Sequence, residues 1–392
     1  MLDLVVIGLI FALVFHSNKR ASQTFGPLHA PATKRFLDRL FLYHCFFSCL
    51  FLLVPGDSVG YWNFGFQQLS VHSDNMKDYF GVGTTFLLFL DFIPARVMGL
   101  SFFTGNFIYS IFGFLGLRYL YFLFVGSLKI NVQILGKPVI PWLFYLPNVN
   151  FWTAGLGKDT LCFFGIACFL YSMQAYRKRL IPLVLSFALV YYIRPHMGMM
   201  IIAGAGVGIV FSREMKPVYK MIFLALAGVG FFLIYQKVTQ FLMVEDLSVN
   251  SLSGLARDQA FNLSRGNTGS SVDISSYSEP LRLFTYLYRP LFFDAHNIIG
   301  LAASVENVVY IVITVKGVQA LRRRDIRVLP IWLKTGFVIA ILSMLVFANS
   351  LGNLGIIMRM KNMTMIYLLM VCIWLMNRRR QEMPGIATVP AK

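Results

Sequence analysis

Apolar runs of about 20 residues recur along the whole chain, and they constrain its fold more than any other feature. A helix that crosses the hydrocarbon core of a bilayer needs about 20 largely apolar residues. The composition agrees, because 57% of the residues are hydrophobic and 13% are charged, whereas soluble domains carry about 25% charged residues. The sequence therefore predicts an all-α fold: a polytopic transmembrane helical bundle that forms a single integral membrane domain over residues 1–392.

Basic residues gather in short clusters between the apolar runs. The clusters are Lys19 and Arg20; Lys34, Arg35 and Arg39; Arg177, Lys178 and Arg179; Arg213, Lys216 and Lys220; Arg322, Arg323, Arg324 and Arg327; and Arg378, Arg379 and Arg380. Short loops rich in Lys and Arg mark the cytoplasmic side, so we expect the N-terminus outside and the C-terminus in the cytoplasm. No basic segment alternates with stacking aromatics, and the net charge of +18 therefore does not indicate a nucleic-acid partner.

This topology predicts about 11 spans. They are expected at 2–16, 40–55, 107–127, 139–154, 160–176, 180–193, 197–212, 219–239, 297–316, 329–348 and 355–376. Residues 56–105 form an outer loop, in which 84–100 contains Asp91, Pro94 and Arg96. We expect that segment to lie on the outer leaflet or to dip into it. Residues 240–296 form a large outer loop.

Charged residues outside the basic clusters converge on the outer side of this topology. They are Asp57, Lys158, Asp159, Arg194, His196, Arg289, Asp294, Arg359 and Lys361. Glu306 falls within the expected span 297–316, and an acid inside a membrane span is a functional candidate. Several of these residues have a simpler interpretation. Lys158 or Lys361 can snorkel to headgroups, and Asp159 can cap a helix. Asp57 can occupy a turn, and Glu306 can pair with a neighbouring helix. Several cations with a few acids at one membrane depth nevertheless predict a polar cavity that opens outward.

The chemistry that suits such a cavity is anionic. Arg binds phosphate with a planar fork and Lys adds a compact charge, and a polyprenyl (pyro)phosphate presents such a group at the membrane face. Asp57 or Asp159 can then act as a general base for an acceptor hydroxyl, and His196 is the alternative, although a lone histidine is more often a packed one. The sequence contains no HExxH motif and no Cys/His set with ligand spacing, so no cofactor is evident. A divalent cation held by Asp57 and a substrate phosphate stays open.

Four motifs carry a resemblance to a known group of proteins. "LPNVNFWTAGLGKD", "YYIRPHMGMM", "YLYRPLFFDAHNIIGLAASVENVV" and "NLGIIMRMKNM" occur in an order that resembles bacterial polytopic proteins of polysaccharide assembly. Those proteins are O-antigen or exopolysaccharide polymerase-like, and some are similar to GT-C glycosyltransferases. The resemblance implies that the site is lined by Lys158, Arg194, His196, Arg289 and Arg359, and that Asp57 in "GDSVGYW" matches the catalytic carboxylate of GT-C enzymes. Only about fifteen residues follow the last expected span, which favours a polymerase-like architecture.

The expected function is glycosyl transfer from polyprenyl-(pyro)phosphate-linked sugars at the outer face of a bacterial inner membrane. Catalytic candidates are Asp57, His196 and Asp159; phosphate-binding candidates are Lys158, Arg194, Arg289, Arg359 and Lys361; Glu306 and Asp294 complete the cavity. The expected partners are a polyprenyl-linked sugar or oligosaccharide, membrane lipid and other polysaccharide-assembly proteins. The alternatives are a transporter or flippase of a lipid-linked or anionic solute, which would need charges reachable from both faces, and a non-catalytic scaffold.

Overall fold

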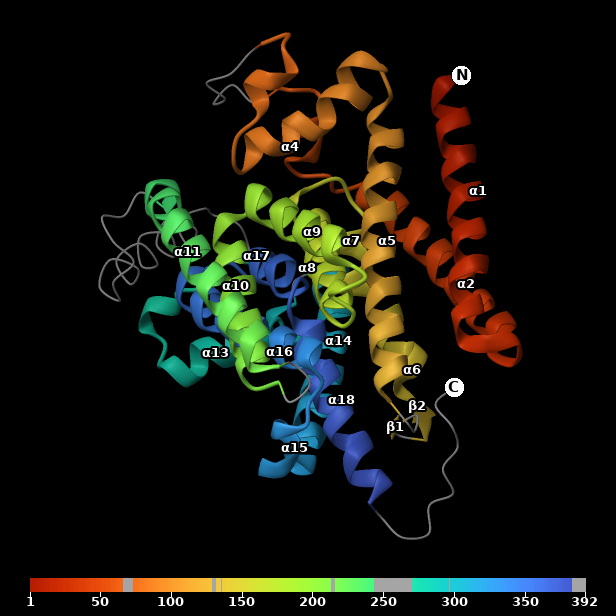
Figure 1. The fold of residues 1–392 in the computed structure, drawn as a ribbon. Helices are drawn as coiled ribbons and strands as arrows, with labels where there is room; N and C mark the ends of the chain where they lie inside the picture. Colours follow the sequence, from red (N-terminus) through yellow and green to blue (C-terminus); the bar gives the residue numbers. More distant parts are fainter. Residues whose placement is uncertain are drawn as a thin grey trace. The chain divides into compact units, whose positions relative to one another are not determined.

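The computed structural model describes residues 1–65, 73–128, 132–134, 136–212, 216–242, 270–295 and 297–382. It is 80% helical (Figure 1), which confirms an all-α polytopic helical protein. The backbone divides into two compact units within these residues. Among the described residues, unit 1 contains Met1–Ser172 and Tyr176–Arg194, and unit 2 contains Met173–Ala175 and residues 195–382. The expectation of a single integral domain stays a prediction.

Unit 1 contains nine helices in the part of the chain that the structure describes, together with one small hairpin. The elements are α1 Leu2–Ser22, α2 Gly26–Phe51, α3 Ser58–Trp62, α4 Thr84–Asp91, α5 Phe102–Ser127, β1 Gln133–Ile134, β2 Lys137–Pro138, α6 Val139–Trp142, α7 Pro147–Thr153, α8 Lys158–Met173 and α9 Leu180–Ile193. The strands are antiparallel, with Gln133 opposite Pro138. A π-helical segment, Phe92–Val97, continues α4.

Helix α5 packs closely in unit 1 because glycines on its surface leave room for neighbouring groups. A Cβ atom on Gly105 would meet the Trp62 ring, and one on Gly113 would lie 1.8 Å from the Thr153 carbonyl oxygen of α7. Small residues allow such close backbone approach between membrane helices. The Ser101 hydroxyl begins α5 by accepting a hydrogen bond from the Thr104 N–H, which satisfies one of the free donors of the first turn.

The segment predicted as one span at 139–154 is divided among α6, a 3-10 turn and α7. Pro147 begins α7, and a proline cannot donate the hydrogen bond that would continue a preceding helix. Helices α7 and α8 are then bent by 108° at the break between Thr153 and Lys158. Lys158 and Asp159 therefore lie at a sharp turn inside unit 1.

Unit 2 contains eight helices within the described residues. They are α10 Pro195–Val210, α11 Pro217–Leu242, α13 Glu279–Tyr288, α14 Ile298–Ala320, α15 Arg323–Arg327, α16 Ile331–Ser350, α17 Leu354–Lys361 and α18 Met365–Gln381. Prolines open α10 and α11, where a missing N–H has no helical partner to lose. The side chain of Asn297 caps α14 and that of Asn353 caps α17.

Helices α10 and α16 pack through small residues. A Cβ atom on Gly204 would lie 2.9 Å from the Thr335 carbonyl oxygen, and one on Gly208 would lie 2.3 Å from the Thr335 hydroxyl. The spacing Gly204-x3-Gly208 places both glycines on one face of α10. This arrangement is the small-xxx-small packing typical of helices in membranes.

Four helices are long and apolar enough to cross a membrane among the described residues: α1 with the turn after it, α5, α14 and α16. Two bent pairs, α7 with α8 and α17 with α18, pass the same test together and raise the number to six. These helices support a membrane-embedded protein. The count of about 11 spans, the sidedness and the bacterial inner membrane stay predictions.

The two outer loops of the sequence-based topology are described unequally. In 56–105, α4 has 8 residues and the π-helical segment has 6, so neither reaches the length of a span. Residues 243–269 and 296 of the predicted loop 240–296 lie outside the described residues. Its later part contains α13 and a bridge from Ser271 to Asn353 at the start of α17.

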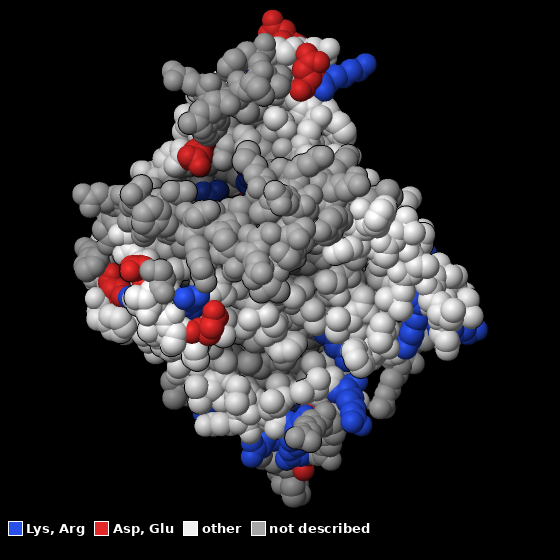
Figure 2. All heavy atoms as spheres, turned by 90° about the vertical axis from the view of Figure 1, so that its left-hand side faces the viewer, with Lys and Arg blue, Asp and Glu red and all other residues white. Residues whose placement is uncertain are grey.

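Basic side chains of unit 2 gather around α15 and the C-terminal part of α18, at the lower end of Figure 2. Arg322 contacts Glu382 at 2.5 Å, and Arg378 lies 3.9 Å from Asp325. Helix α14 has 23 residues and is therefore about 35 Å long, with its first residue just after Asp294 and its last just before this basic group. Within unit 2, the segment that contains Asp294 and the basic group around α15 thus lie at opposite ends of α14.

Candidate functional site

Four predicted site residues belong to one region of unit 1, which we call the unit 1 cluster: Asp57, Lys158, Asp159 and Arg194. They come from the start of α3, the first turn of α8 and the residue after α9. Contacts between residues far apart in the sequence hold the start of α4, which carries Thr84, against the end of α9. The Gly83 N–H at the start of α4 donates to the Tyr192 carbonyl of α9 at 2.7 Å, and Phe86 stacks on the Tyr192 ring.

The turn before Lys158 is held by polar side chains buried in unit 1. The Leu156 N–H donates to the Asn106 side-chain oxygen at 2.9 Å, and the Leu156 carbonyl accepts from the Ser58 hydroxyl at 2.5 Å. The Thr160 hydroxyl donates to the Gly155 carbonyl at 2.5 Å. Because buried polar groups need such partners, these contacts fix where α8 begins and which way Lys158 leaves the turn.

Lys158 is half-buried beside a hydroxyl and an aromatic ring. Its ammonium donates to the Thr84 hydroxyl at 2.7 Å and lies 5.6 Å from the centre of the Tyr61 ring. A cation over a tyrosine face is attracted by the ring quadrupole. The cation is therefore positioned by α3 and α4 as well as by its own helix.

Asp159 and Arg194 form an ion pair in the same cluster. The Arg194 guanidinium donates to the Asp159 carboxylate at 2.5 Å, and the two side chains are 12% and 6% exposed. This contact connects the end of α9 to the first turn of α8. The carboxylate that we expected to cap α8, or to act as a base, thus has an arginine partner in this structure.

Asp57 is exposed at the residue before α3, and its side chain does not cap that helix. Its neighbour Ser58 contacts Leu156, and Tyr61, one turn further, lies under Lys158. Residues four apart lie on the same face of a helical turn. Asp57 is therefore an exposed acid one helical turn from the ring that contacts Lys158.

A second group, the unit 2 cluster, contains Arg289, Asp294, Glu306, Asn307 and Lys361. Arg289 contacts Asp294 through two hydrogen bonds, at 3.0 Å from Nε and 2.5 Å from Nη2, and donates a third at 3.2 Å to the Tyr277 hydroxyl. The hydrogen bonds that Arg289 donates to Asp294 hold the pKa of Arg289 above its ordinary value. The fork that we expected to bind a phosphate is thus engaged by a carboxylate of the same loop.

Lys361 is fully buried at the end of α17. Its ammonium donates to the Asn307 side-chain oxygen at 2.6 Å and to the carbonyls of Arg289 at 3.1 Å and Leu287 at 3.4 Å. An ammonium has three donors, so protein oxygens occupy all of them. Lys361 therefore joins α17 to the segment between α13 and α14, and a bound phosphate would have to displace one of these acceptors.

The other predicted residues of unit 2 are Glu306, which belongs to the unit 2 cluster, and His196 and Arg359, which come from α10 and α17. Glu306 is 4% exposed and accepts a hydrogen bond from Tyr310 of the same helix. His196 packs edge-on against the Phe347 ring, with 6.0 Å between ring centres. Arg359 is half-buried on α17. The ten predicted residues thus divide between two units, with four in unit 1 and six in unit 2.

Sequence patterns did not single out Thr84, Tyr277 or Asn307 as site residues. Asn307 carried a detectable signal, because a lone amide inside the apolar stretch 298–315 needs a hydrogen-bond partner. It receives one from Lys361 and donates to the Pro290 carbonyl at 2.7 Å. Thr84 carried no signal, since its contact with Lys158 spans 74 positions.

Asp91 is a further buried acid in unit 1, at the junction of α4 and the π-helical segment. It is 1% exposed, and one of its oxygens accepts a hydrogen bond from the Tyr109 hydroxyl at 2.6 Å. The other oxygen is buried without a hydrogen-bond partner among the described residues. Burial raises the pKa of Asp91 to about 7. Segments of π-helix occur frequently at functional sites, which makes this junction a region to test.

No group of three or more His, Cys, Asp or Glu side chains that could hold a metal ion occurs among the described residues. A divalent cation bound by Asp57 and a substrate phosphate stays a prediction. Comparisons with protein-family models, curated proteins and solved structures found no match to this chain. The resemblance to polysaccharide-assembly proteins therefore stays an expectation drawn from the four motifs.

Proposed function

We propose that the protein transfers glycosyl groups from polyprenyl-(pyro)phosphate-linked sugars to an acceptor at the outer face of a membrane, as a repeat-unit polymerase or a GT-C-like glycosyltransferase. The observation that carries the proposal is the unit 1 cluster. It combines a cation held by a hydroxyl and an aromatic ring, at Lys158, with an exposed acid one turn from that ring, at Asp57.

Lys158 is the residue to which we assign the leaving phosphate. In the proposed step, the bond between the sugar C1 and the phosphate oxygen breaks, and the electron pair stays on the (pyro)phosphate. A positioned cation stabilises the charge that develops on that oxygen, and removal of one such group typically lowers turnover by about 10²–10³-fold.

Asp57 is the residue to which we assign the acceptor proton. An acceptor hydroxyl loses its proton to the carboxylate as its oxygen forms the new bond to C1, so that atoms and charges balance. General bases of this kind contribute about 10²–10⁴-fold. Asp159 is a weaker candidate, because its carboxylate is paired with Arg194 at 2.5 Å.

Purified protein in lipid nanodiscs, supplied with a polyprenyl-pyrophosphate-linked oligosaccharide, tests the proposal. Elongation of the oligosaccharide is measured by mass spectrometry. We expect Lys158→Gln to lower the rate by about 10²-fold or more, and Asp57→Asn to abolish elongation while the lipid-linked substrate still binds. Lys137→Gln is the matched control, because Lys137 is also in unit 1 and also lies over an aromatic ring, 5.8 Å from the centre of Trp142.

Two results would overturn the proposal. Wild-type elongation rates in both Lys158→Gln and Asp57→Asn, at normal protein levels, would remove the unit 1 cluster from catalysis. Absence of elongation by the wild-type chain, with movement of the lipid-linked oligosaccharide between the leaflets of protein-containing vesicles, would instead support the transporter or flippase alternative.

A further inference from the structure

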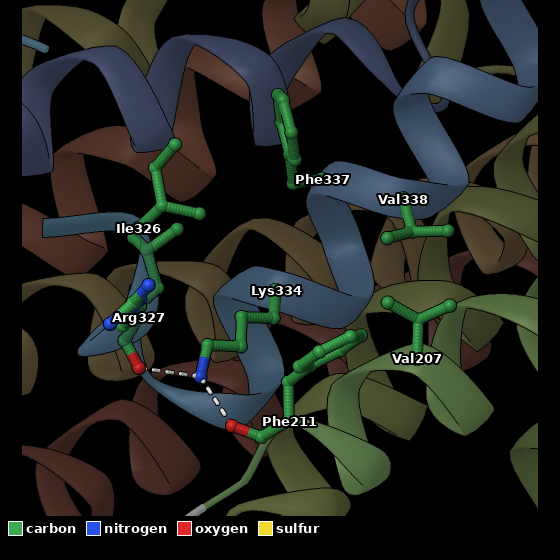
Figure 3. A pocket seen from close by; sticks show the side chains of 8 residues that line it. Val207, Phe211, Ile326, Arg327, Lys334, Phe337 and Val338 are labelled. Atoms are coloured by element: carbon green, nitrogen blue, oxygen red, sulfur yellow. Dashed lines mark hydrogen bonds between the residues drawn. The ribbon is translucent and has the colours of Figure 1, made fainter. Parts of the chain in front are cut away.

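Unit 2 contains an apolar pocket of about 470 Å³ between the C-terminal end of α10 and the N-terminal part of α16. None of the predicted site residues lines it. Val207 and Phe211 form one side, Phe337 and Val338 form another, and Ile326 lies on the α15 side (Figure 3). Leu329 also lines the pocket. The volume is within the range of pockets that hold small ligands, about 300–1,000 Å³. The apolar walls continue onto the surface, where Phe211 is 65% exposed.

Cations stand at the same end of the pocket. The two charged residues that line it are Lys334 and Arg327. The Lys334 ammonium donates to the carbonyls of Phe211 at 2.8 Å and Arg327 at 2.9 Å, as Figure 3 shows. Lys220 donates to the Ser212 carbonyl at 2.5 Å, beside the same helix end. The ends of α10 and α15 thus carry fixed positive charge next to an apolar opening.

The acid of α15 does not neutralise this charge. Asp325 is 2% exposed and lies 3.9 Å from Arg378, outside the pocket. Among the residues that the structure describes, no acidic side chain lies within ion-pair distance of Arg327, whose side chain is exposed. The rim therefore offers a guanidinium that can form a bidentate contact with a phosphate.

We propose that this pocket binds an anionic phospholipid, with acyl chain against the apolar walls and headgroup phosphate at Arg327. Charge complementarity decides the occupant. The pocket lies where two apolar helices end and basic loops begin, which is the level at which a headgroup meets acyl chains. Basic pockets between membrane helices on the cytoplasmic side bind anionic headgroups, and residues 213–220 and 322–327 are the loops that the sequence places on that side.

Lipid titration of the purified full-length chain in neutral detergent tests the proposal. Bound lipid is counted by native mass spectrometry, and the shift of the unfolding temperature is followed in parallel. The probes are phosphatidylglycerol, phosphatidylcholine and the soluble anion glycerol 3-phosphate. We expect phosphatidylglycerol to bind at least about fivefold more tightly than phosphatidylcholine, since each basic residue near a headgroup contributes about 1 kcal/mol. Glycerol 3-phosphate should give no shift at the same concentrations.

Two variants and one control separate the headgroup from the tail. Arg327→Gln should weaken phosphatidylglycerol about fivefold and phosphatidylcholine less, because the choline cation offsets the charge of its phosphate. Val207→Trp, at a 40% exposed position on the pocket wall, should weaken both lipids by filling the space for the chain. Arg20→Gln removes an exposed arginine from another predicted cytoplasmic cluster and should change neither affinity.

Three outcomes would overturn the proposal. Equal affinity for the two lipids would show that the basic rim does not recognise the headgroup. An equal effect of Arg327→Gln and Arg20→Gln would assign lipid binding to general surface charge. A shift with glycerol 3-phosphate that matches the shift with phosphatidylglycerol would make the site one for a free phosphate. If Val207→Trp does not fold, Arg327→Gln alone decides between these outcomes.

Discussion

The Arg194 guanidinium lies 2.5 Å from the Asp159 carboxylate, and both side chains are almost excluded from solvent. The contact joins the residue after α9 to the first turn of α8, within the region that also positions Lys158. A predicted phosphate ligand and a predicted base thus contact each other. Their first role is to hold the turn in place, and a role toward substrate depends on that geometry.

Breaking this ion pair should destabilise the protein strongly. Arg194→Gln or Asp159→Asn leaves one buried charge without its partner, for which we expect a loss of about 3–5 kcal/mol. The double variant should lose less than the sum of the two, because no unpaired charge remains. Unfolding of the four proteins in detergent, combined as a double-mutant cycle, measures the coupling. Additive losses would show that the two side chains act independently.

Lys361→Met should destabilise unit 2. The substitution keeps the apolar stem of a fully buried side chain but removes the ammonium, leaving the Asn307 amide oxygen and two carbonyls without their donor. Each buried acceptor left unsatisfied costs about 1–3 kcal/mol. Lys316→Met, at an exposed position on α14, is the control and should unfold like the wild type. An unchanged unfolding temperature for Lys361→Met would contradict a structural role for Lys361.

Two glycines of α5 should respond oppositely to alanine. A Cβ atom on Gly113 would lie 1.8 Å from the Thr153 carbonyl oxygen, so Gly113→Ala forces α5 and α7 apart. Overpacking typically destabilises a protein by about 1–3 kcal/mol, and we expect a larger loss here. Gly126→Ala meets no atom within 4 Å and should be neutral, or stabilising by up to about 1 kcal/mol through helix propensity. The yield of folded protein and its unfolding temperature measure both. Tolerance of Gly113→Ala would contradict this packing.

Asp91 should make the stability of unit 1 fall as the pH rises. Burial raises the pKa of Asp91 from 3.8 to about 7, so between these values the folded chain keeps a proton that the unfolded chain releases. Stability falls wherever the folded state binds more protons. The loss should begin near pH 4, continue to about pH 7 and amount to roughly 4 kcal/mol at most.

The unfolding temperature, measured at intervals from pH 4 to pH 8, tests this dependence. Asp91→Asn places a neutral amide at the same position and should remove the fall between pH 4 and pH 7. The Tyr109 hydroxyl donates to the Asp91 carboxylate at 2.6 Å and favours its ionised form. Tyr109→Phe should therefore extend the fall to higher pH, and identical profiles for wild type and Asp91→Asn would assign the dependence to other groups.

Apolar runs predicted the helical class, because a membrane helix satisfies its backbone hydrogen bonds within one continuous stretch of sequence. Helices α10 and α11 begin at Pro195 and Pro217, two residues before the predicted spans 197–212 and 219–239. The break between α7 and α8 was less predictable. It depends on Asn106 and Ser58, which contact Leu156 from 50 and 98 positions away, and no local pattern records such contacts.

The sequence indicated individual charged residues but not which of them contact each other. The sequence indicated Lys158, Asp159 and Arg194 as unusual charges, and the structure brings them into one region of unit 1. Which charges neutralise each other depends on the geometry of side chains from different helices. Arg289, for example, pairs with Asp294 five positions later, although the sequence predicted that Arg289 binds a phosphate.

The contact between Lys361 and Asn307 constrains how the chain can evolve. The two residues are 54 positions apart and both are buried. Loss of one side chain therefore leaves a buried polar group of the other without this hydrogen bond. Among related chains the two positions should change together, through pairs that keep one donor and one acceptor or through two apolar residues. A set of relatives in which either position varies alone would show that other polar groups can replace the partner.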